Sequence, residues 1–261
     1  MHMKLLALTL LLAAPAMAED NEPYFTPEEI ESLAPERCRG MVEISSGPFT
    51  FGDSYAAAGR RTPPAFKPLI KPVTIKTTGA FLIDKCEVTQ LQAHATWMMA
   101  FGKSAGELNP KDPEAEHPQV TMNLKYAETF CKYLGKRLPT EEEWEKAARG
   151  GTSTIYYWGD VYDDGQVYEQ STSKFNLRRL TGPVAEKLPN PYGLYDMLGN
   201  APEMTSGSCW KGGGRMLWSE YYAAVGRCAK PAEPGRPHNY GWRCVKDVVP
   251  NKSVKKDTEP Q

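Results

Sequence analysis

Six cysteines in a chain that opens with an export signal limit the fold of this protein more than any other feature of its sequence. Residues 1–18 have the order of a cleavable signal peptide, with Lys4 ahead of a short apolar run and a small-residue cleavage site that ends at Ala18. The run is too short for the roughly 20 apolar residues of a spanning helix, so we expect no membrane span. The mature protein is expected in the periplasm or outside the cell. In such an oxidising compartment an even number of cysteines predicts disulfides, although their pairing stays open.

The charge balance argues against charged polymers as partners. The chain of 261 residues has 31 basic and 32 acidic residues and a net charge of −1. It therefore lacks the basic excess that marks proteins binding nucleic acid or anionic membranes. A chain of this length can bury a substantial core within one domain.

Hydrophobic periodicity predicts an α+β domain of short elements and long loops rich in glycine and proline. The expected helices are residues 27–33, 88–99, 123–134 and 140–149. The expected strands are residues 42–44, 49–51, 73–75 and 81–83. The first two strands flank Gly47 and Pro48, a pattern typical of a hairpin. Thr140 and Glu143 have the spacing of a capping box at the start of the last helix.

A polar loop at residues 190–203 supplies the ligand types of a hard cation. Asp196 and Glu203 provide two carboxylates, and Gly199 with Asn200 permits a tight turn that would direct main-chain carbonyls at the same point. Calcium takes about six to eight oxygen ligands, so this loop could form half of its shell. A polar surface turn is the alternative that the residue types alone leave open.

Four segments carry a family pattern in the right order. They are MVEI and GPFTFG with FLIDKCEVT (residues 41–89), GKRLPTEEEWEKAARGG (135–151), NPYGLYDMLGNAPE (190–203) and YGWRC (240–244). Together they resemble the formylglycine-generating enzyme, or sulfatase-modifying factor, family. The resemblance implies that family's variant of the C-type lectin fold, with little regular secondary structure. With the family domain at residues 41–247, the chain is expected to comprise a signal peptide (1–18), a lead-in (19–40), this domain and a polar tail (248–261).

The resemblance also implies a calcium site and a disulfide pattern. It places calcium on the side chains of Asp196 and Glu203 and on the main-chain carbonyls of Gly199 and Ala201. The implied disulfides are Cys131–Cys244, matched directly to the family, and Cys209–Cys228 and Cys38–Cys86. The second of these follows because Ala148 replaces the family partner of Cys228, and Cys209 is the nearest unassigned cysteine in sequence.

The family's copper centre is missing from this sequence. The segment from Lys211 to Cys228 corresponds to the one in which the family has two copper-binding cysteines. Leu217 or Trp218 stands at the first of these positions, and Tyr222 or Ala223 at the second. Because a copper–thiolate centre needs soft sulfur ligands, we expect neither copper nor formylglycine generation by the family mechanism.

The resemblance leaves three functions open. The first is a periplasmic accessory or maturation factor that binds an exported protein or a small molecule. The second is an oxidoreductase of the siderophore (pyoverdine) maturation kind, with Glu220 as general base and His238 and Arg215 as partners in the cleft; a solvated Glu220 is the alternative. The third is a lectin-like ligand-recognition module. Of the other histidines, His94 is expected to be exposed and His117 to be structural.

Overall fold

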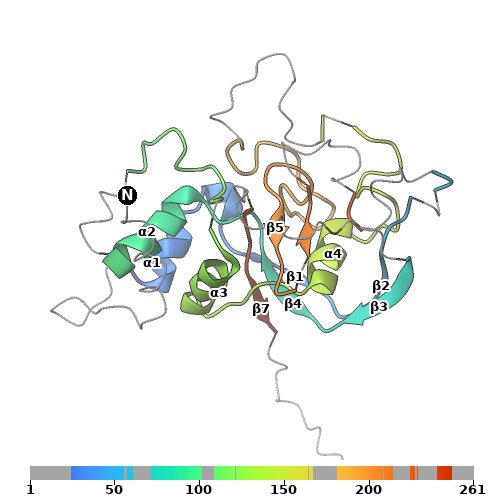
Figure 1. The fold of residues 1–261 in the computed structure, drawn as a ribbon, viewed down its shortest axis with the longest axis horizontal. Coiled ribbons are helices and arrows are strands. Elements are labelled where there is room, and N and C mark those ends of the chain that lie inside the picture. Colours follow the sequence, from blue (N-terminus) through green and yellow to red (C-terminus); the bar gives the residue numbers. More distant parts are fainter. Residues whose placement is uncertain are drawn as a thin grey trace, which may run out of the picture.

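A computed structural model of the chain shows how these elements are arranged (Figure 1). The described residues are 25–55, 58–60, 72–101, 109–120, 122–163, 165–166, 181–207, 209–213, 224–226, 228 and 240–248. The helices are α1 (Pro27–Ser32), the 3₁₀ helix η2 (Glu36–Cys38), α2 (Gln90–Phe101), α3 (Leu124–Tyr133) and α4 (Glu141–Arg149). The strands are β1 (Met41–Ile44), β2 (Gly47–Phe51), β3 (Thr74–Thr78), β4 (Phe81–Asp84), β5 (Glu203–Met204), β6 (Trp210–Lys211) and β7 (Val245–Asp247).

Helices α1 and α4 begin at residues whose chemistry favours an N-cap. Thr140 and Glu143 exchange hydrogen bonds in a capping box at the start of α4, and Thr26 and Glu29 do the same at α1. Helix α4 ends at Gly150, whose φ of 58° is left-handed. A Cβ at Gly150 would also lie 2.6 Å from Cδ of Pro191, so glycine is required there for two reasons.

The expected hairpin of the first two strands is wrong. Strand β1 pairs with β4, and β2 pairs with β3, both antiparallel and in the same register. The chain from Met41 to Phe51 therefore runs as one long bent strand beside the chain from Thr74 to Asp84. A break at Ser45 and Ser46 lies between the two ladders, and Gly47 follows with a φ of 128°. The alternation of residues predicted the strands, but long-range pairing decided their partners.

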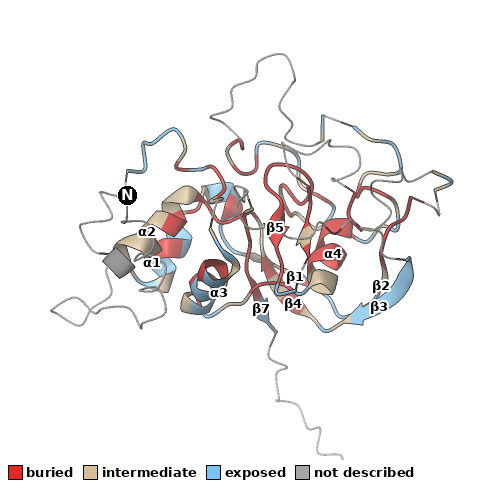
Figure 2. Cartoon of the chain, viewed as in Figure 1, coloured by how far each residue is buried: buried red, intermediate tan, exposed pale blue. Residues whose placement is uncertain are grey.

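Two hydrophobic clusters lie on opposite sides of the central sheet, which has the order β1-β4-β7. Helices α1, α2 and α3 lie on one side in Figure 1 and pack around Trp242. Helix α4 lies on the other side and packs its Trp144 and Ala147 with Ile83 and Leu194. Figure 2 shows that α4 and β5 are largely buried, whereas β3 faces solvent. Among the described residues no helix is both long enough and apolar enough to cross a membrane.

Three disulfides connect these parts, and they pair as expected. Cys131–Cys244 joins α3 to the segment before β7, Cys38–Cys86 joins η2 to the loop after β4, and Cys209–Cys228 joins the residue before β6 to position 228. The six cysteines of the chain are thereby all in disulfides.

Candidate functional site

The loop from Asp196 to Glu203 adopts an unusual backbone that turns it sharply. Asp196 and Asn200 have left-handed φ values of 52° and 54°, and Gly199 has a φ of 95°. Aspartate and asparagine tolerate this region better than other residues with side chains, and glycine adopts it freely. The residue types that suggested a cation site are therefore also those that this backbone requires.

Glu87 holds the turn in place from the opposite side. Its Oε2 accepts a 2.8 Å hydrogen bond from Nδ2 of Asn200, and its Oε1 accepts one of 3.0 Å from the backbone N–H of Ala201. Asn200 in turn accepts a 2.9 Å hydrogen bond from the backbone N–H of Gly182. We did not predict a role for Glu87 from the sequence, although it lies in the matched FLIDKCEVT segment. Two buried side chains thus connect three segments that are distant in sequence.

Glu203 lies at the end of the loop in a buried ion pair. Arg243 donates to its carboxylate through Nε at 2.8 Å and through Nη2 at 2.6 Å, and Nε1 of Trp144 donates at 2.8 Å. Arg243 also donates to the carbonyl oxygen of Tyr195. Burial alone would lower the pKa of Arg243, but the charge of Glu203 and its hydrogen bonds raise the pKa above its usual value. Arg243 therefore stays charged, and its N–H groups together with Nε1 of Trp144 occupy both oxygens of Glu203.

The carboxylate of Asp196 accepts fewer hydrogen bonds than that of Glu203. Its Oδ2 accepts a 2.6 Å hydrogen bond from the backbone N–H of Ala185, and no described residue donates to its Oδ1. Burial raises the pKa of Asp196 to about 6, against the opposing effects of Ala185 and Arg243. The pKa of Glu87 is raised well above its usual range, first by burial and then by the negative charges of Asp196 and Glu203. Three buried carboxyl groups thus surround one arginine.

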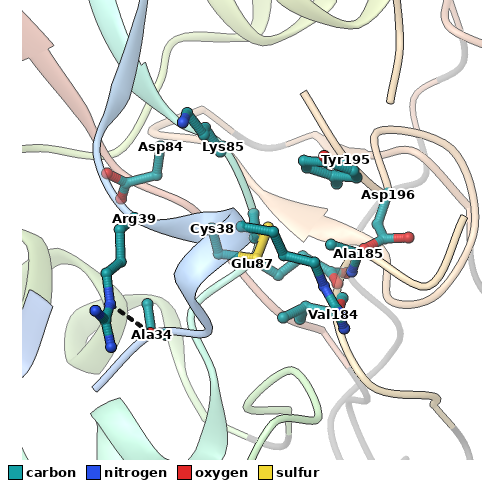
Figure 3. The surroundings of a disulfide bond; sticks show 12 residues. Ala34, Cys38, Arg39, Asp84, Lys85, Glu87, Val184, Ala185, Tyr195 and Asp196 are labelled. Atoms are coloured by element: carbon teal, nitrogen blue, oxygen red, sulfur yellow. Dashed lines mark hydrogen bonds between the residues drawn. A yellow bond between two sulfur atoms is a disulfide. The ribbon is translucent and has the colours of Figure 1, made fainter. Parts of the chain in front are cut away.

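A small apolar cluster lies beside this site. Figure 3 shows the Cys38–Cys86 disulfide beside Glu87, with Ala185 and Asp196 close by. Both cysteines pack with Val184 and Ala185 in a buried cluster. This packing contributes to the burial that raises the pKa values of Glu87 and Asp196.

Three of the four expected calcium ligands have an oxygen to which no described residue donates a hydrogen bond. No described residue donates a hydrogen bond to Oδ1 of Asp196 or to the carbonyl oxygens of Gly199 and Ala201, although all three residues are buried. Buried main-chain carbonyls without a partner are uncommon, so these oxygens are suited to a metal ion. The fourth ligand, Glu203, differs because its oxygens already accept hydrogen bonds from Arg243 and Trp144.

Comparison with known proteins places the chain in a family. Residues 26–248 match the sequence profile of the sulfatase-modifying factor enzyme 1-like domain. The chain belongs to this family. The matched region confirms the resemblance found in the sequence, and it begins within the segment that we assigned to the lead-in.

Individual relatives show how far the likeness extends. The sulfatase-modifying factor domain of this chain is similar to the formylglycine-generating enzyme of Bos taurus, with 30% identity over 208 residues, 64% of this chain and 55% of the relative. It is also similar to the inactive C-alpha-formylglycine-generating enzyme 2 of Bos taurus, with 33% identity over 120 residues, 43% of this chain and 38% of the relative. The alignments thus span about half or less of the length of these relatives. The solved structure of PvdO from Pseudomonas aeruginosa has a TM-score of 0.59 at 20% identity, covering 87% of this chain and 99% of PvdO. That likeness confirms the fold.

The expected catalytic residues of this sulfatase-modifying factor domain lie outside the described residues. They are Arg215, Glu220 and His238. The residues that replace the copper-binding cysteines, Leu217 or Trp218 and Tyr222 or Ala223, also lie outside the described part of the chain. Their roles therefore stay predictions.

The two ends of this segment are described, and both are firmly held. Lys211 is buried and donates a 2.8 Å hydrogen bond to Oε2 of Glu145, whose Oε1 accepts from Arg149 at 2.7 Å. At the other end Gly226 packs so closely on Gly52 that a Cβ would lie 2.0 Å from its carbonyl oxygen. We did not anticipate this ion network, since its three charged members come from α4 and β6.

The two described histidines have different environments. His117 is buried, and its Nδ1 lies 3.2 Å from Oγ1 of Thr181, in agreement with a structural role. The expectation that His94 is exposed is wrong. His94 is half-buried, and its Nε2 is buried without a hydrogen-bond partner among the described residues.

Proposed function

We propose that this protein is an exported accessory or maturation factor that works without a copper centre and binds an exported protein or a small molecule. The observation that carries the proposal is the state of its cysteines. All six are in disulfides, so no thiol remains as a ligand for copper–thiolate chemistry. A relative named as an inactive formylglycine-generating enzyme supports a role for the domain that does not require formylglycine formation.

We further propose that the loop from Asp196 to Ala201 holds a structural calcium ion. The open oxygens of Asp196, Gly199 and Ala201 would bind it, with water completing the shell. The ion would offset part of the negative charge that Glu87, Asp196 and Glu203 bring into the interior. In this proposal Glu203 supports the loop chiefly through Arg243, and any bond to calcium would add to the ion pair.

Metal content and activity of the mature, oxidised protein test the proposal. Elemental analysis with a calcium titration should find about one calcium per chain, and a copper titration should find no tight binding. A cysteine-containing sulfatase-type peptide should not be converted to the aldehyde. Tight stoichiometric copper or formation of the aldehyde would contradict the proposal and favour an oxidase.

Partner binding needs its own experiment. Trp210 is half-buried in β6, and its ring lies 3.6 Å from that of Tyr240 between centroids, so these two rings are a candidate contact for a partner. A photo-crosslinking residue at Trp210 should capture a specific exported protein in cells. The same residue at Val161, which is 70% exposed on another loop, is the matched control. Equal capture from both positions would argue against a protein partner at this surface.

A further inference from the structure

The Cys38–Cys86 disulfide lies beside the loop from Asp196 to Ala201, for which we propose a calcium ion (Figure 3). The bridge connects η2 to the residues that follow β4, across 48 positions of sequence. The sequence neighbours of both cysteines contact either the loop or the segment that supports it. The bridge is therefore placed to hold the loop from outside.

Glu87, which directly follows Cys86, holds the carboxyl end of the loop. Its carboxylate accepts hydrogen bonds from Nδ2 of Asn200 at 2.8 Å and from the N–H of Ala201 at 3.0 Å. Asn200 has a left-handed φ of 54°, so the turn at this point depends on the contacts that hold it. The carbonyl oxygen of Ala201 is one of the open oxygens, and its direction follows from the orientation of the turn. The position of Cys86 thus affects the position of an expected ligand.

Lys85, on the other side of Cys86, holds the amino end of the loop. Its carbonyl oxygen accepts a 2.9 Å hydrogen bond from the N–H of Tyr195, the residue before Asp196. Tyr195 also packs against the buried cluster that contains both cysteines. The two neighbours of Cys86 therefore hold the two ends of one loop, and a shift of this short segment would move both.

The other half of the bridge supports the segment that orients Asp196. Cys38 packs with Val184 and Ala185 in the buried cluster. Nη2 of Arg37, the residue before Cys38, donates a 2.9 Å hydrogen bond to the carbonyl oxygen of Val184. The N–H of Ala185 then donates to Oδ2 of Asp196 at 2.6 Å. This bond fixes the carboxylate and leaves its other oxygen, Oδ1, for a ligand.

Ala185 has a backbone conformation that needs such support. Its φ of 59° is left-handed, a region that residues with a Cβ avoid for steric reasons. Such conformations persist where the surrounding packing requires them, and they occur often at ligand sites. Ala185 is 7% exposed, and the disulfide forms part of its packing. Without the bridge the chain at Ala185 can relax, and its N–H would then turn away from Asp196.

We propose that the Cys38–Cys86 disulfide positions Asp196 and Ala201 for calcium and thereby sets the calcium affinity of the loop. Oxygens that are held in place before the ion arrives lose less entropy when it binds. The inference rests on the proposed calcium ion and concerns residues that position its ligands without touching it. A bridge that only stabilised the fold would change the melting temperature but not the calcium Kd of the folded protein.

Calorimetric titration of the calcium-free, oxidised mature protein with calcium tests this inference. Cys38→Ser/Cys86→Ser should bind calcium about tenfold more weakly than the unaltered protein, because its ligands are no longer pre-organised. Cys209→Ser/Cys228→Ser removes the bridge beside β6 and is the matched control, with an affinity within about twofold of the unaltered protein. Unchanged affinity in Cys38→Ser/Cys86→Ser, or an equal loss in both double variants, would overturn the proposal.

Val184→Ala gives the same comparison if the first double variant does not fold. It keeps the bridge but removes side-chain atoms that pack with Cys38, Cys86 and Ala185. Its calcium affinity should fall about threefold, since the support of Ala185 is loosened but not lost. An affinity equal to that of the unaltered protein would contradict the proposal.

The substitution Ala185→Gly tests the route to Asp196. Glycine adopts the left-handed region freely, so this variant keeps the N–H while it needs less support from the bridge. Added to Cys38→Ser/Cys86→Ser, it should restore calcium affinity by about threefold or more. No gain in the triple variant would overturn the part of the proposal that concerns Asp196.

Hydrogen exchange separates this inference from the calcium proposal. In calcium-free protein the N–H groups of Ala185 and Ala201 should exchange at least about tenfold faster in Cys38→Ser/Cys86→Ser, whereas that of Trp144 in α4 should not change. If no protein binds calcium but this difference is seen, the calcium proposal is wrong and the bridge still positions the loop. If the unaltered protein binds calcium and neither affinity nor exchange responds to the loss of the bridge, the positioning inference is wrong.

Discussion

Glu203 and Arg243 form an ion pair with almost no contact with solvent, since their side chains are 1% and 0% exposed. Such a pair depends on the hydrogen bonds that replace the lost hydration. Arg243 obtains further bonds from the carbonyl oxygens of Lys85 and Tyr195, and Glu203 obtains one from Trp144. The pair therefore joins β5, α4 and the segment before β7 at a single point.

The substitution Glu203→Gln should destabilise the protein strongly. It leaves the guanidinium of Arg243 buried without a counter-charge, which costs about 3–5 kcal/mol in free energy of unfolding. Urea denaturation would measure this loss with and without calcium, and the loss should be similar in both cases. Glu116→Gln, at an exposed position, should change stability by less than about 0.5 kcal/mol. A loss for Glu203→Gln that vanishes after chelation would instead mean that Glu203 acts mainly as a calcium ligand.

The contribution of Asp196 to stability should depend on calcium, unlike that of Glu203. If its Oδ1 binds calcium, chelation should lower the melting temperature of the unaltered protein by about 5–10 °C, as expected for an ion present at 100 times its Kd. Asp196→Ala should melt at a lower temperature from the start, and chelation should then have little further effect. Differential scanning calorimetry with and without chelator would show this. An unaltered protein whose melting temperature does not respond to chelation would remove the calcium proposal.

At the scale of elements, α4 is the best-anchored helix of the structure. Its first turn carries the capping box of Thr140 and Glu143, and the carboxylate of Glu143 also accepts two 2.7 Å hydrogen bonds from Arg137. Burial alone would raise the pKa of Glu143, but the bonds from Arg137 and Thr140 outweigh it and lower the pKa below its usual value. The helix thus begins with a charged cap whose strength depends on pH.

The substitution Glu143→Gln should reduce stability in a pH-dependent manner. Because the pKa of Glu143 is lower in the folded state, its contribution is fully present above the ordinary value of 4.5 and is lost as pH falls through the folded value. We expect a loss of about 1–2 kcal/mol at pH 7 that shrinks below pH ~4. Urea denaturation from pH 3 to 7 would measure it. Glu142→Gln, whose carboxylate lies 4.0 Å from Lys76 at the surface, is the matched control and should show almost no loss. A pH-independent loss for Glu143→Gln would contradict the role of the ionised cap.

At the scale of the whole molecule, the disulfides should contribute unequally to stability because they close loops of different length. Cys131–Cys244 links positions 113 residues apart, whereas Cys209–Cys228 links positions 19 residues apart. A cross-link that closes a longer loop removes more entropy from the unfolded chain. The longer bridge should therefore contribute more to the stability of the domain.

Replacing each pair of cysteines by alanine should show this order. Removal of Cys131–Cys244 should cost about 1.5 kcal/mol more than removal of Cys209–Cys228, from the difference in loop length. The complete burial of Cys131 and Cys244 adds a packing loss in the same direction. Chemical denaturation of the two double variants would compare them. A larger loss for the shorter bridge would contradict this order and would mean that the segment between Cys209 and Cys228 governs global stability.

The helix caps, the turn at Asp196 and the fold could be predicted from the sequence, because the interactions involved are local or the motifs are specific. The caps of α1 and α4 depend on residues three positions apart, and the turn at Asp196 and Asn200 depends on residue types that tolerate a left-handed backbone. The family motifs then implied the fold and the pairing of Cys131 with Cys244.

The tertiary structure decided what depends on contacts between distant residues. Only the folded chain places Glu87 against Asn200 and Ala201, more than 110 residues away, and Arg243 against Glu203, 40 residues away. It paired β1 with β4 instead of with β2, and it partly buried His94, which local pattern assigned to the surface. Periodicity specifies which face of an element is apolar, but the partner of a strand, a buried charge or a pocket wall is set by packing across the whole domain.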